Sequence, residues 1–362
     1  MRFTQIIGQD TATRALQRSI REDAVSHAYL FTGLEGVGKF TTALALAAAL
    51  NCENPPEPGE SCGECVQCRM IEAGRHPDVS SVAPSGGSED TRIKQMQEMR
   101  RMAHYPPLRG RWKVNILERA ETLNEDAGSC ILKLLEEPPS FLVLIVVSSN
   151  PSAMLTTIRS RCQLVRFRAM SAESLENVLV ERFQADSEQA KFLAAFSEGR
   201  PGRAISLLGN DDFFARRDAL VALVNRAIDE PVAGALKLSE ELRKLAGGSV
   251  VPDVEEEAEA DDEEEEPSQP SRGRTKLKKT DLIRALDTLV LWYRDLLSIK
   301  VRGPEAPVVN LDKAAELAER AAQCHLSYLR SSLKTLTDAK RYLDGNANVQ
   351  LLSDVLAMRL MQ

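Results

Sequence analysis

The chain has 362 residues, of which 43% are hydrophobic and only 5% aromatic, so it can form two or three domains with mainly aliphatic cores. Its formal net charge is −7, but segment 253–266 holds eleven acidic residues, and removing these leaves +4 on the remainder. That balance is compatible with nucleic acid as a partner. The N-terminus has no signal-type apolar segment, and no apolar run approaches the roughly 20 residues of a membrane span. We therefore expect a soluble, cytoplasmic protein with no membrane partner.

The first part of the chain alternates strand-like and helix-like patterns. Apolar runs at 28–31, 113–117 and 141–147 predict buried strands, and the Ala- and Leu-rich stretch 41–50 predicts a helix. Continuous apolar strands separated by helices are typical of a parallel sheet that is covered on both faces. The sequence therefore predicts an α/β domain over residues 1–168.

The remaining residues are predicted to be helical. Region 169–209 is too short to fold comfortably alone, and we expect it to pack as a lid on the first domain. Region 210–362 is predicted to be an all-helical domain, interrupted at 247–279 by a Gly-Gly pair, the acidic run and a basic stretch, which we expect to be disordered. The predicted helices of the two regions are 171–183, 187–197, 203–208, 213–228, 232–245, 280–300, 312–341 and 349–361.

A phosphate-binding loop (P-loop) is predicted directly after the first strand. Residues 33–40 read Gly-Leu-Glu-Gly-Val-Gly-Lys-Phe and match the pattern GxxxxGK[ST] except at the last position. In this pattern glycines let backbone N–H groups surround phosphates, the lysine reaches the β and γ oxygens, and the hydroxyl binds Mg²⁺. The candidate phosphate-binding residues are Gly33, Gly36, Gly38 and Lys39.

The last position of the pattern departs from what hydrolysis needs. Phe40 stands where the hydroxyl belongs, and a phenyl ring cannot ligate a cation that demands oxygen. Thr41 is the nearest substitute, but one residue turns a side chain by about 100° around a helix, so we expect its hydroxyl to point away from the metal position. A degenerate loop could still bind phosphate through its helix N-terminus. The alternative is a glycine-rich turn that binds nothing.

A second position typical of nucleotide hydrolases is also altered. The strand at 113–117 is followed by Glu118 and Arg119, where such enzymes carry one acid for Mg²⁺ and its water and another for the attacking water. Glu118 could serve the first role, but Arg119 cannot act as a base. The alternative for both residues is surface salt bridging.

Four of the seven cysteines lie within seventeen residues. Cys52, Cys62, Cys65 and Cys68 have the spacing C-x9-C-x2-C-x2-C, which suits one tetrahedral Zn²⁺ held by four thiolates. Four protein ligands leave no open position, so the predicted zinc module at 52–68 would be structural. Reduced surface thiols or a redox switch are the alternatives.

Two arginines are candidates for contact with phosphate. Arg161, in the run Ile-Arg-Ser-Arg-Cys at 158–162, could act as an arginine finger on the nucleotide of a neighbouring subunit. Arg203, after the turn Gly-Arg-Pro-Gly, could face a phosphate from the lid. The alternative for each is an ordinary surface arginine.

With these features together, the chain resembles the delta-prime family of clamp-loader AAA+ subunits of bacterial DNA polymerase III. The resemblance covers nearly the whole chain except 247–279. Besides the phosphate loop and the cysteines, the segments that carry it are Phe3–Gln9, Ser26–Gly33, Leu132–Pro139, Leu155–Cys162, Gly199–Ala204 and Asn346–Asn348. Most of these are shared with the gamma/tau motor subunits, and Phe40, Arg119 and the Asn-Ala-Asn segment favour delta-prime.

The resemblance implies a RecA-like AAA+ domain, a helical lid and a helical collar at 210–362 that holds a ring together. Such a subunit would be a scaffold in a hetero-pentameric ring with gamma/tau and delta, and would supply Arg161 in trans without needing its own ATP. The ring would load the sliding clamp onto primer-template DNA, as part of a DNA polymerase (nucleotidyltransferase) holoenzyme. Binding of ATP or ADP by this chain stays open. The alternatives are an active gamma/tau-type ATPase and a zinc-containing DNA-binding adaptor.

Overall fold

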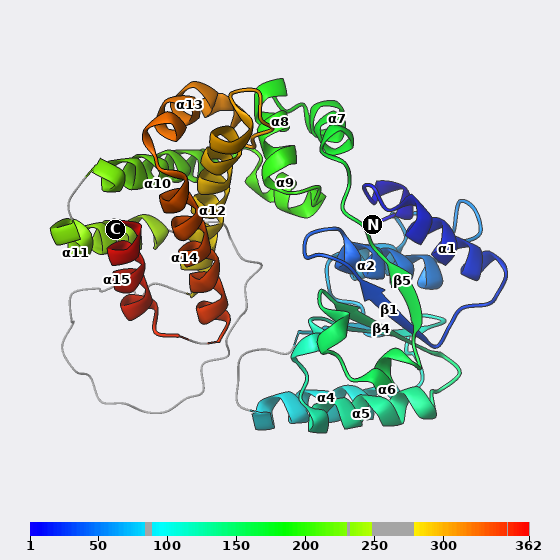
Figure 1. Ribbon diagram of the computed structural model, residues 1–362. Helices are drawn as coiled ribbons and strands as arrows, with labels where there is room; N and C mark the ends of the chain where they lie inside the picture. Colours follow the sequence, from blue (N-terminus) through cyan, green and yellow to red (C-terminus); the bar gives the residue numbers. More distant parts are fainter. Residues whose placement is uncertain (84–88, 230–231, 248–278, 346, 362) are drawn as a thin grey trace, which may run out of the picture. The chain divides into compact units, whose positions relative to one another are not determined.

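The computed structural model describes residues 1–83, 89–229, 232–247, 279–345 and 347–361 (Figure 1). The chain divides into two compact units. The first holds Met1–Ala185 and Ser197–Ile205, and the second holds Asp186–Phe196 and Ser206–Gln362. The linker predicted to be disordered lies almost entirely outside the described residues.

The first unit is built on a parallel sheet whose five described strands have the order β2-β3-β4-β1-β5. The strands are β1 (Ala28–Thr32), β2 (Val79–Val82), β3 (Lys113–Leu117), β4 (Leu142–Ser148) and β5 (Gln163–Arg166). Its helices are η1 (Phe3–Gln5), α1 (Asp10–Arg21), α2 (Lys39–Asn51), α3 (Val66–Glu72), α4 (Glu89–Ala103), η2 (Ala120–Thr122), α5 (Glu125–Glu136), η3 (Pro151–Ala153), α6 (Thr156–Arg159) and α7 (Ala172–Phe183).

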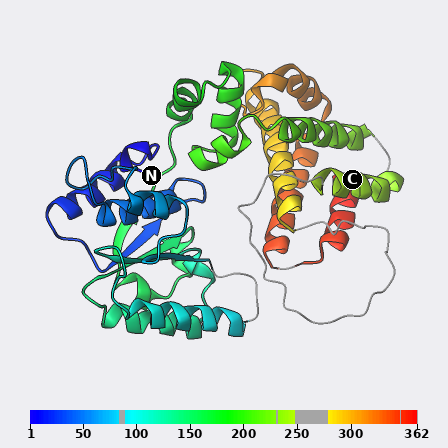
Figure 2. The ribbon, with the colours of Figure 1, turned by 180° about the vertical axis from the view of Figure 1, so that it is seen from behind.

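Helices cover both faces of this sheet because successive side chains of a strand point to opposite faces. In β1, Tyr29 and Phe31 pack in a cluster with α1, α2 and α3, whereas Ala28 and Leu30 pack in a second cluster with α4, α5 and α6. Figures 1 and 2 show α1 and α2 on one side of the sheet and α4 and α5 on the other. The predicted α/β fold class, a parallel sheet covered by helices on both faces, is confirmed, and the three predicted strands correspond to β1, β3 and β4.

The described secondary-structure elements of the second unit are all helices. Its elements are α8 (Ser187–Phe196), α10 (Asp211–Asp229), η4 (Val232–Gly234), α11 (Ala235–Ala246), α12 (Lys279–Arg302), η5 (Leu311–Lys313), α13 (Ala314–Gln323), α14 (Leu326–Asp344) and α15 (Val349–Leu360). Helix α12 supplies the centre of the core, where Trp292 and Tyr293 are fully buried. The indole Nε1 of Trp292 donates to Oδ1 of Asn225 in α10 at 3.1 Å, which satisfies the one polar atom of that ring.

The predicted continuous helix over 312–341 is wrong. Cys324 and His325 adopt extended backbone angles and separate α13 from α14. Neither residue is a glycine or proline, so the sequence carries no strong signal for the break.

The predicted lid region does not belong to a single unit. Helix α7 and residues 201–205 of α9 (Pro201–Leu207) lie in the first unit, and α8 lies in the second. The boundaries of separate lid and collar domains therefore stay predictions. Among the described residues, no helix is both long and apolar enough to cross a membrane.

Candidate nucleotide site and cysteine cluster

The phosphate loop joins the carboxyl end of β1 to the start of α2, the strand–loop–helix setting that the motif requires. Gly38 has φ 100° and Gly36 has φ 79°, in the left-handed region that favours glycine. A Cβ on Gly36 would lie 3.3 Å from the backbone nitrogen of Arg203, so a side chain there would press against the neighbouring segment. The loop therefore keeps the backbone shape of a phosphate cradle.

Lys39 is turned back on the loop that precedes it. Its side chain is buried, and its Nζ donates to the carbonyl oxygens of Gly33 at 2.6 Å and Leu34 at 2.7 Å. A third contact, at 3.3 Å, joins Nζ to Oγ of Ser149 beyond the end of β4. Burial lowers the pKa of Lys39, and the negative charges of Glu121 and Glu35 act in the opposite sense.

Three residues at the start of α2 decide what the site offers a metal ion. The half-buried ring of Phe40 packs against the apolar cluster between α2 and the sheet. Thr41 is exposed, and Thr42 is buried with its Oγ1 donating to the carbonyl of Gly38 at 2.7 Å. The position that should present a hydroxyl to Mg²⁺ therefore presents a hydrocarbon ring.

The segment after β3 carries two acidic residues, Glu118 and Glu121, and the charge of Glu121 acts on Lys39. Glu118 is half-buried, and burial raises its pKa, while Arg119 has φ 45° and is exposed at the start of η2. The turn carries the chain to Glu121, whose Oε1 accepts the backbone N–H of Ser149 at 3.2 Å. Glu121 and Ser149 were not predicted as site residues. Ser149 could have been found from its position just after β4, because the carboxyl ends of parallel strands lie at the same edge of a sheet as the phosphate loop.

The start of α9, which carries Arg203, lies against the phosphate loop. The backbone N–H of Gly202 donates to the carbonyl oxygen of Gly36 at 2.8 Å. Arg203 is half-buried, with its backbone beside Gly36. The structure therefore brings together all the predicted phosphate-binding segments, and phosphate binding by these residues stays a prediction.

Arg161 lies apart from this cradle, between α6 and β5. Its guanidinium pairs with Oε1 of Glu136 in α5 at 2.9 Å and donates to the carbonyl of Thr157 at 3.1 Å. The side chain is 39% exposed. It is therefore oriented by two contacts and still accessible from outside the unit.

The four clustered cysteines converge as their spacing predicts. Their four sulfur atoms lie within 4.8 Å of one another, and none is in a disulfide. The backbone N–H groups of Glu64 and Cys65 lower the pKa of Cys62 to about 6, whereas burial raises the pKa of Cys68. Converging sulfurs with amide donors suit a thiolate-bound metal such as zinc, and this cluster could hold one.

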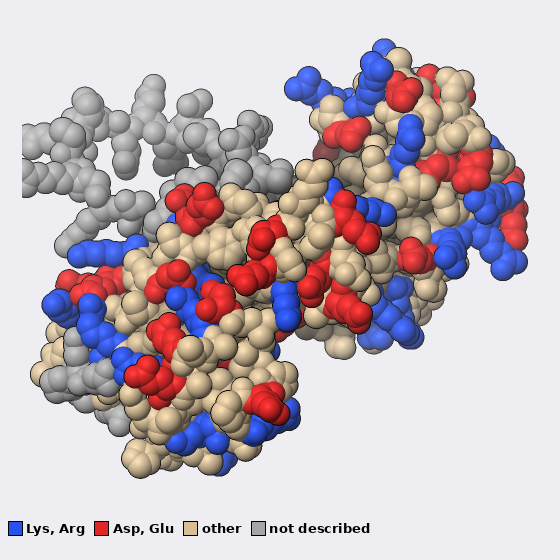
Figure 3. Space-filling model, turned by 90° about the horizontal axis from the view of Figure 1, so that it is seen from above, with Lys and Arg blue, Asp and Glu red and all other residues tan. Residues whose placement is uncertain are grey.

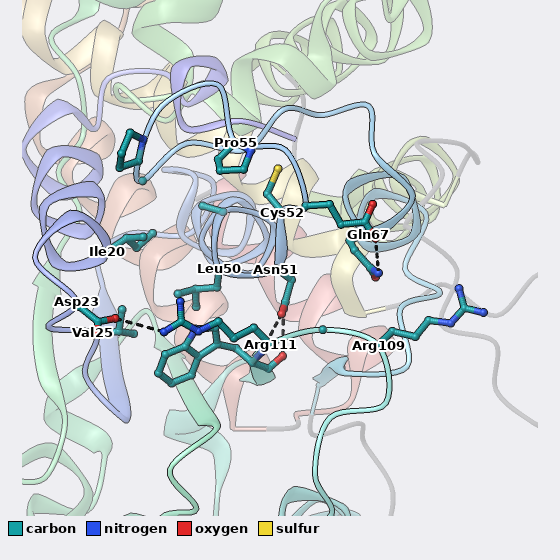
Figure 4. A pocket seen from close by; sticks show the side chains of 16 residues that line it. Ile20, Asp23, Val25, Leu50, Asn51, Cys52, Pro55, Gln67, Arg109 and Arg111 are labelled. Atoms are coloured by element: carbon teal, nitrogen blue, oxygen red, sulfur yellow. Dashed lines mark hydrogen bonds and ion pairs between the residues drawn. The ribbon is translucent and has the colours of Figure 1, made fainter.

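Buried polar groups hold the cysteine segment to the rest of the unit. Glu60 is buried and accepts the backbone N–H groups of Phe3 at 3.0 Å and Ser61 at 2.9 Å. On the other side, Oδ1 of Asn51 accepts the N–H of Trp112 at 2.9 Å (Figure 4). The cavity in Figure 4, of about 340 Å³, lies beside Cys52 and is lined by both apolar and charged residues.

One face of the molecule can be checked for a gathering of like charges (Figure 3). On the face shown in Figure 3, lysine and arginine side chains are interspersed with aspartate and glutamate over the described residues. That face carries no argument for a nucleic-acid interface.

Similarity to known proteins shows the family of this chain. The family model described as "DNA polymerase III, delta subunit" matches residues 8–171. DNA polymerase III subunit delta' of Bacillus subtilis is 30% identical over 98% of this chain and 96% of its own length. DNA polymerase III subunit tau is 30% identical in Bacillus subtilis and 31% identical in Escherichia coli, over 66% and 71% of this chain but only 43% and 40% of their own lengths. The chain therefore belongs to the delta-prime family of DNA polymerase III subunits, within the clamp-loader proteins of DNA replication.

Proposed function

We propose that this chain is a clamp-loader subunit that supports ATP hydrolysis by a neighbouring subunit without hydrolysing ATP itself. The observation that carries the proposal is the placement of Phe40, whose half-buried ring packs against the apolar cluster and stands in the sequence position of the Mg²⁺ ligand. Without a hydroxyl there, the loop lacks one of the ligands that would hold Mg²⁺. That cation is what would neutralise the charge developing on the γ-phosphate.

Two further features support the loss of hydrolysis. Arg119 replaces the acid that would polarise the attacking water, and its exposed guanidinium has no basic lone pair to accept a proton. Glu118 stays beside it and is half-buried, which raises the pKa of its carboxyl. The altered positions lie after two strands of one sheet and would disable the same reaction.

Arg161 supports a role in trans. It is exposed and is held by Glu136 and Thr157, so its guanidinium is oriented before a partner arrives. An arginine so placed could neutralise charge that develops on the nucleotide of an adjacent subunit. The partners we propose are gamma/tau and delta subunits in a pentameric ring that seats the sliding clamp on primer-template DNA in the cytoplasm.

The cysteine cluster would hold a structural zinc ion. Cys52, Cys62, Cys65 and Cys68 offer four thiolate ligands at convergent positions, which leaves no coordination site for a substrate. The ion would stabilise the cysteine segment. Glu60 already joins this segment to the N-terminus, and Asn51, just before Cys52, joins it to Trp112 at the start of β3.

ATP turnover by the purified chain tests the proposal. We expect no hydrolysis above background, with Lys39→Ala indistinguishable from the parent. Robust turnover that Lys39→Ala abolishes would instead support the alternative of an active gamma/tau-type ATPase, which the retained shape of the loop favours.

Purification with a motor subunit separates the proposal from the other alternative. A clamp-loader subunit should co-purify with gamma/tau. A chain that binds DNA tightly alone and fails to co-purify would be a zinc-containing DNA-binding adaptor instead.

A further inference from the structure

The ammonium group of Lys39 uses its donors entirely within the protein. Two go to backbone carbonyls of the phosphate loop, and the third contact is with Oγ of Ser149. The loop is also held from its other side, because the carbonyl of Gly36 accepts the N–H of Gly202 at 2.8 Å. A phosphate group that enters the loop must therefore compete for Lys39 with Ser149 and with the carboxylate that accepts the backbone N–H of Ser149.

Glu121 supplies that charge. Its Oε1 accepts the N–H of Ser149 at 3.2 Å, so Ser149 bridges the carboxylate and the ammonium. Its Oε2 is buried, and among the described residues it has no hydrogen-bond partner. A buried carboxylate oxygen is costly unless a positive charge lies near it. The cation that meets this need is Lys39.

Other acids near the loop are less suited to this role. Glu35 also acts on Lys39, but it is exposed and water screens its charge. The hydrogen bonds of Lys39 to other described residues go to Gly33, Leu34 and Ser149, and none goes to Glu118. Glu121 differs in accepting the backbone N–H of Ser149, which contacts Lys39, and in having a buried Oε2 atom.

We propose that Glu121 is a built-in anion of the phosphate loop, which balances Lys39 and disfavours the binding of nucleoside di- and triphosphates. A bound polyphosphate would bring two or more negative charges to the same buried cation, and like charges repel strongly where water is scarce. The loop would keep its folded shape without a nucleotide because its own carboxylate provides the counter-charge.

This inference rests on the proposed function, because it explains how a loop that is not used for hydrolysis stays folded. The two can fail separately. Hydrolysis by the parent chain would overturn the proposed function, whereas the inference concerns affinity for phosphate compounds.

Calorimetric titration of the full chain with ADP, with Mg²⁺–ATP and with pyrophosphate tests the inference. Glu121→Gln keeps the shape of the side chain and removes its charge, so it should bind ADP and pyrophosphate at least about tenfold more tightly than the parent. Glu125→Gln, at an exposed position four residues away, is the matched control and should bind as the parent does.

A second measurement separates a counter-ion from a merely structural side chain. Lys39→Met leaves the Glu121 carboxylate buried without its cation and should lower the melting temperature. Adding Glu121→Gln should recover much of that loss, since the unpaired charge is then gone. The inference is overturned if Glu121→Gln binds no more tightly than the parent, or if it does not relieve the effect of Lys39→Met.

Discussion

At the scale of single residues, buried acids in the first unit are held by backbone N–H groups. Asp78 is 1% exposed, and its carboxylate accepts the N–H groups of Leu108 at 2.7 Å and of Arg109 and Gly110, both at 2.8 Å. Three donors converge on one carboxylate, so this side chain fixes the path of the loop that leads into β3. Charge-assisted hydrogen bonds of this kind are stronger than neutral ones.

We expect Asp78→Asn to destabilise the first unit by about 2 kcal/mol at pH 7, because it removes the charge and turns an amide donor toward N–H groups. Burial acts to raise the pKa of Asp78, but the three N–H groups outweigh it and hold the pKa below its usual value. The stabilisation is therefore present above the unfolded pKa of about 3.9 and is lost as the pH falls through the lower folded value. Urea unfolding at pH 7 and pH 3 measures this.

The matched control is Glu137→Gln, at an exposed position of the same unit. It should change the free energy of unfolding by no more than about 0.5 kcal/mol. Equal destabilisation by Asp78→Asn at both pH values would show that the charge of Asp78 is not what holds the loop.

The spacing of residues in the sequence predicts a site only where the residues of that site lie close together in the chain. The phosphate loop and the cysteine cluster could be found because their members lie close together in the chain. The contact of Lys39 with Ser149 spans 110 residues, and that of Ser149 with Glu121 spans 28. No spacing rule reaches such pairs, because they depend on which strands become neighbours in the sheet.

At the scale of elements, the buried strands could be predicted and the edge strands could not. β1, β3 and β4 are buried along their whole length and read as apolar runs. β2 and β5 lie at the two edges of the sheet, and both are short with exposed polar residues. Their sequences therefore resemble loops, and only pairing with β3 and β1 makes them strands.

The cysteine cluster gives a prediction at this scale. Purified protein should contain about one zinc ion per chain, and Cys65→Ser/Cys68→Ser should lose it. Loss of the metal should expose the backbone of residues 52–68 and of the N-terminus, because Glu60 and Ser61 join the two segments. Metal analysis and amide hydrogen exchange measure these effects.

Cys130 provides the control for that experiment. It lies in α5, is buried in the apolar core beneath the sheet, and is not one of the four clustered cysteines. Cys130→Ala should keep the metal content of the parent. Full metal content in the double variant would mean that the four sulfurs are not the ligands.

At the scale of the whole molecule, the proposed function rests on where the altered residues and the retained arginine lie in the parallel sheet. Phe40 and Arg119 follow β1 and β3 at the carboxyl edge of the sheet, whereas Arg161 precedes β5, at the opposite, amino edge of the same parallel sheet. The ring of Phe40 packs against the apolar cluster and Arg119 is exposed, whereas Arg161 makes its contacts with α5 and α6. This separation is what a subunit that assists a neighbour requires.

Reconstitution with motor subunits tests that separation. Arg161→Ala should lower ATP turnover at the neighbouring site by about 10³-fold or more, with assembly intact, since an arginine finger acts on the transition state and not on docking. Arg159→Ala is the matched control, because Arg159 is exposed two residues earlier and should leave turnover unchanged. Glu136→Gln, which loosens the hold on Arg161, should give an intermediate loss. Equal turnover for the Arg161 and Arg159 variants would exclude a finger at this position and leave the chain a scaffold alone.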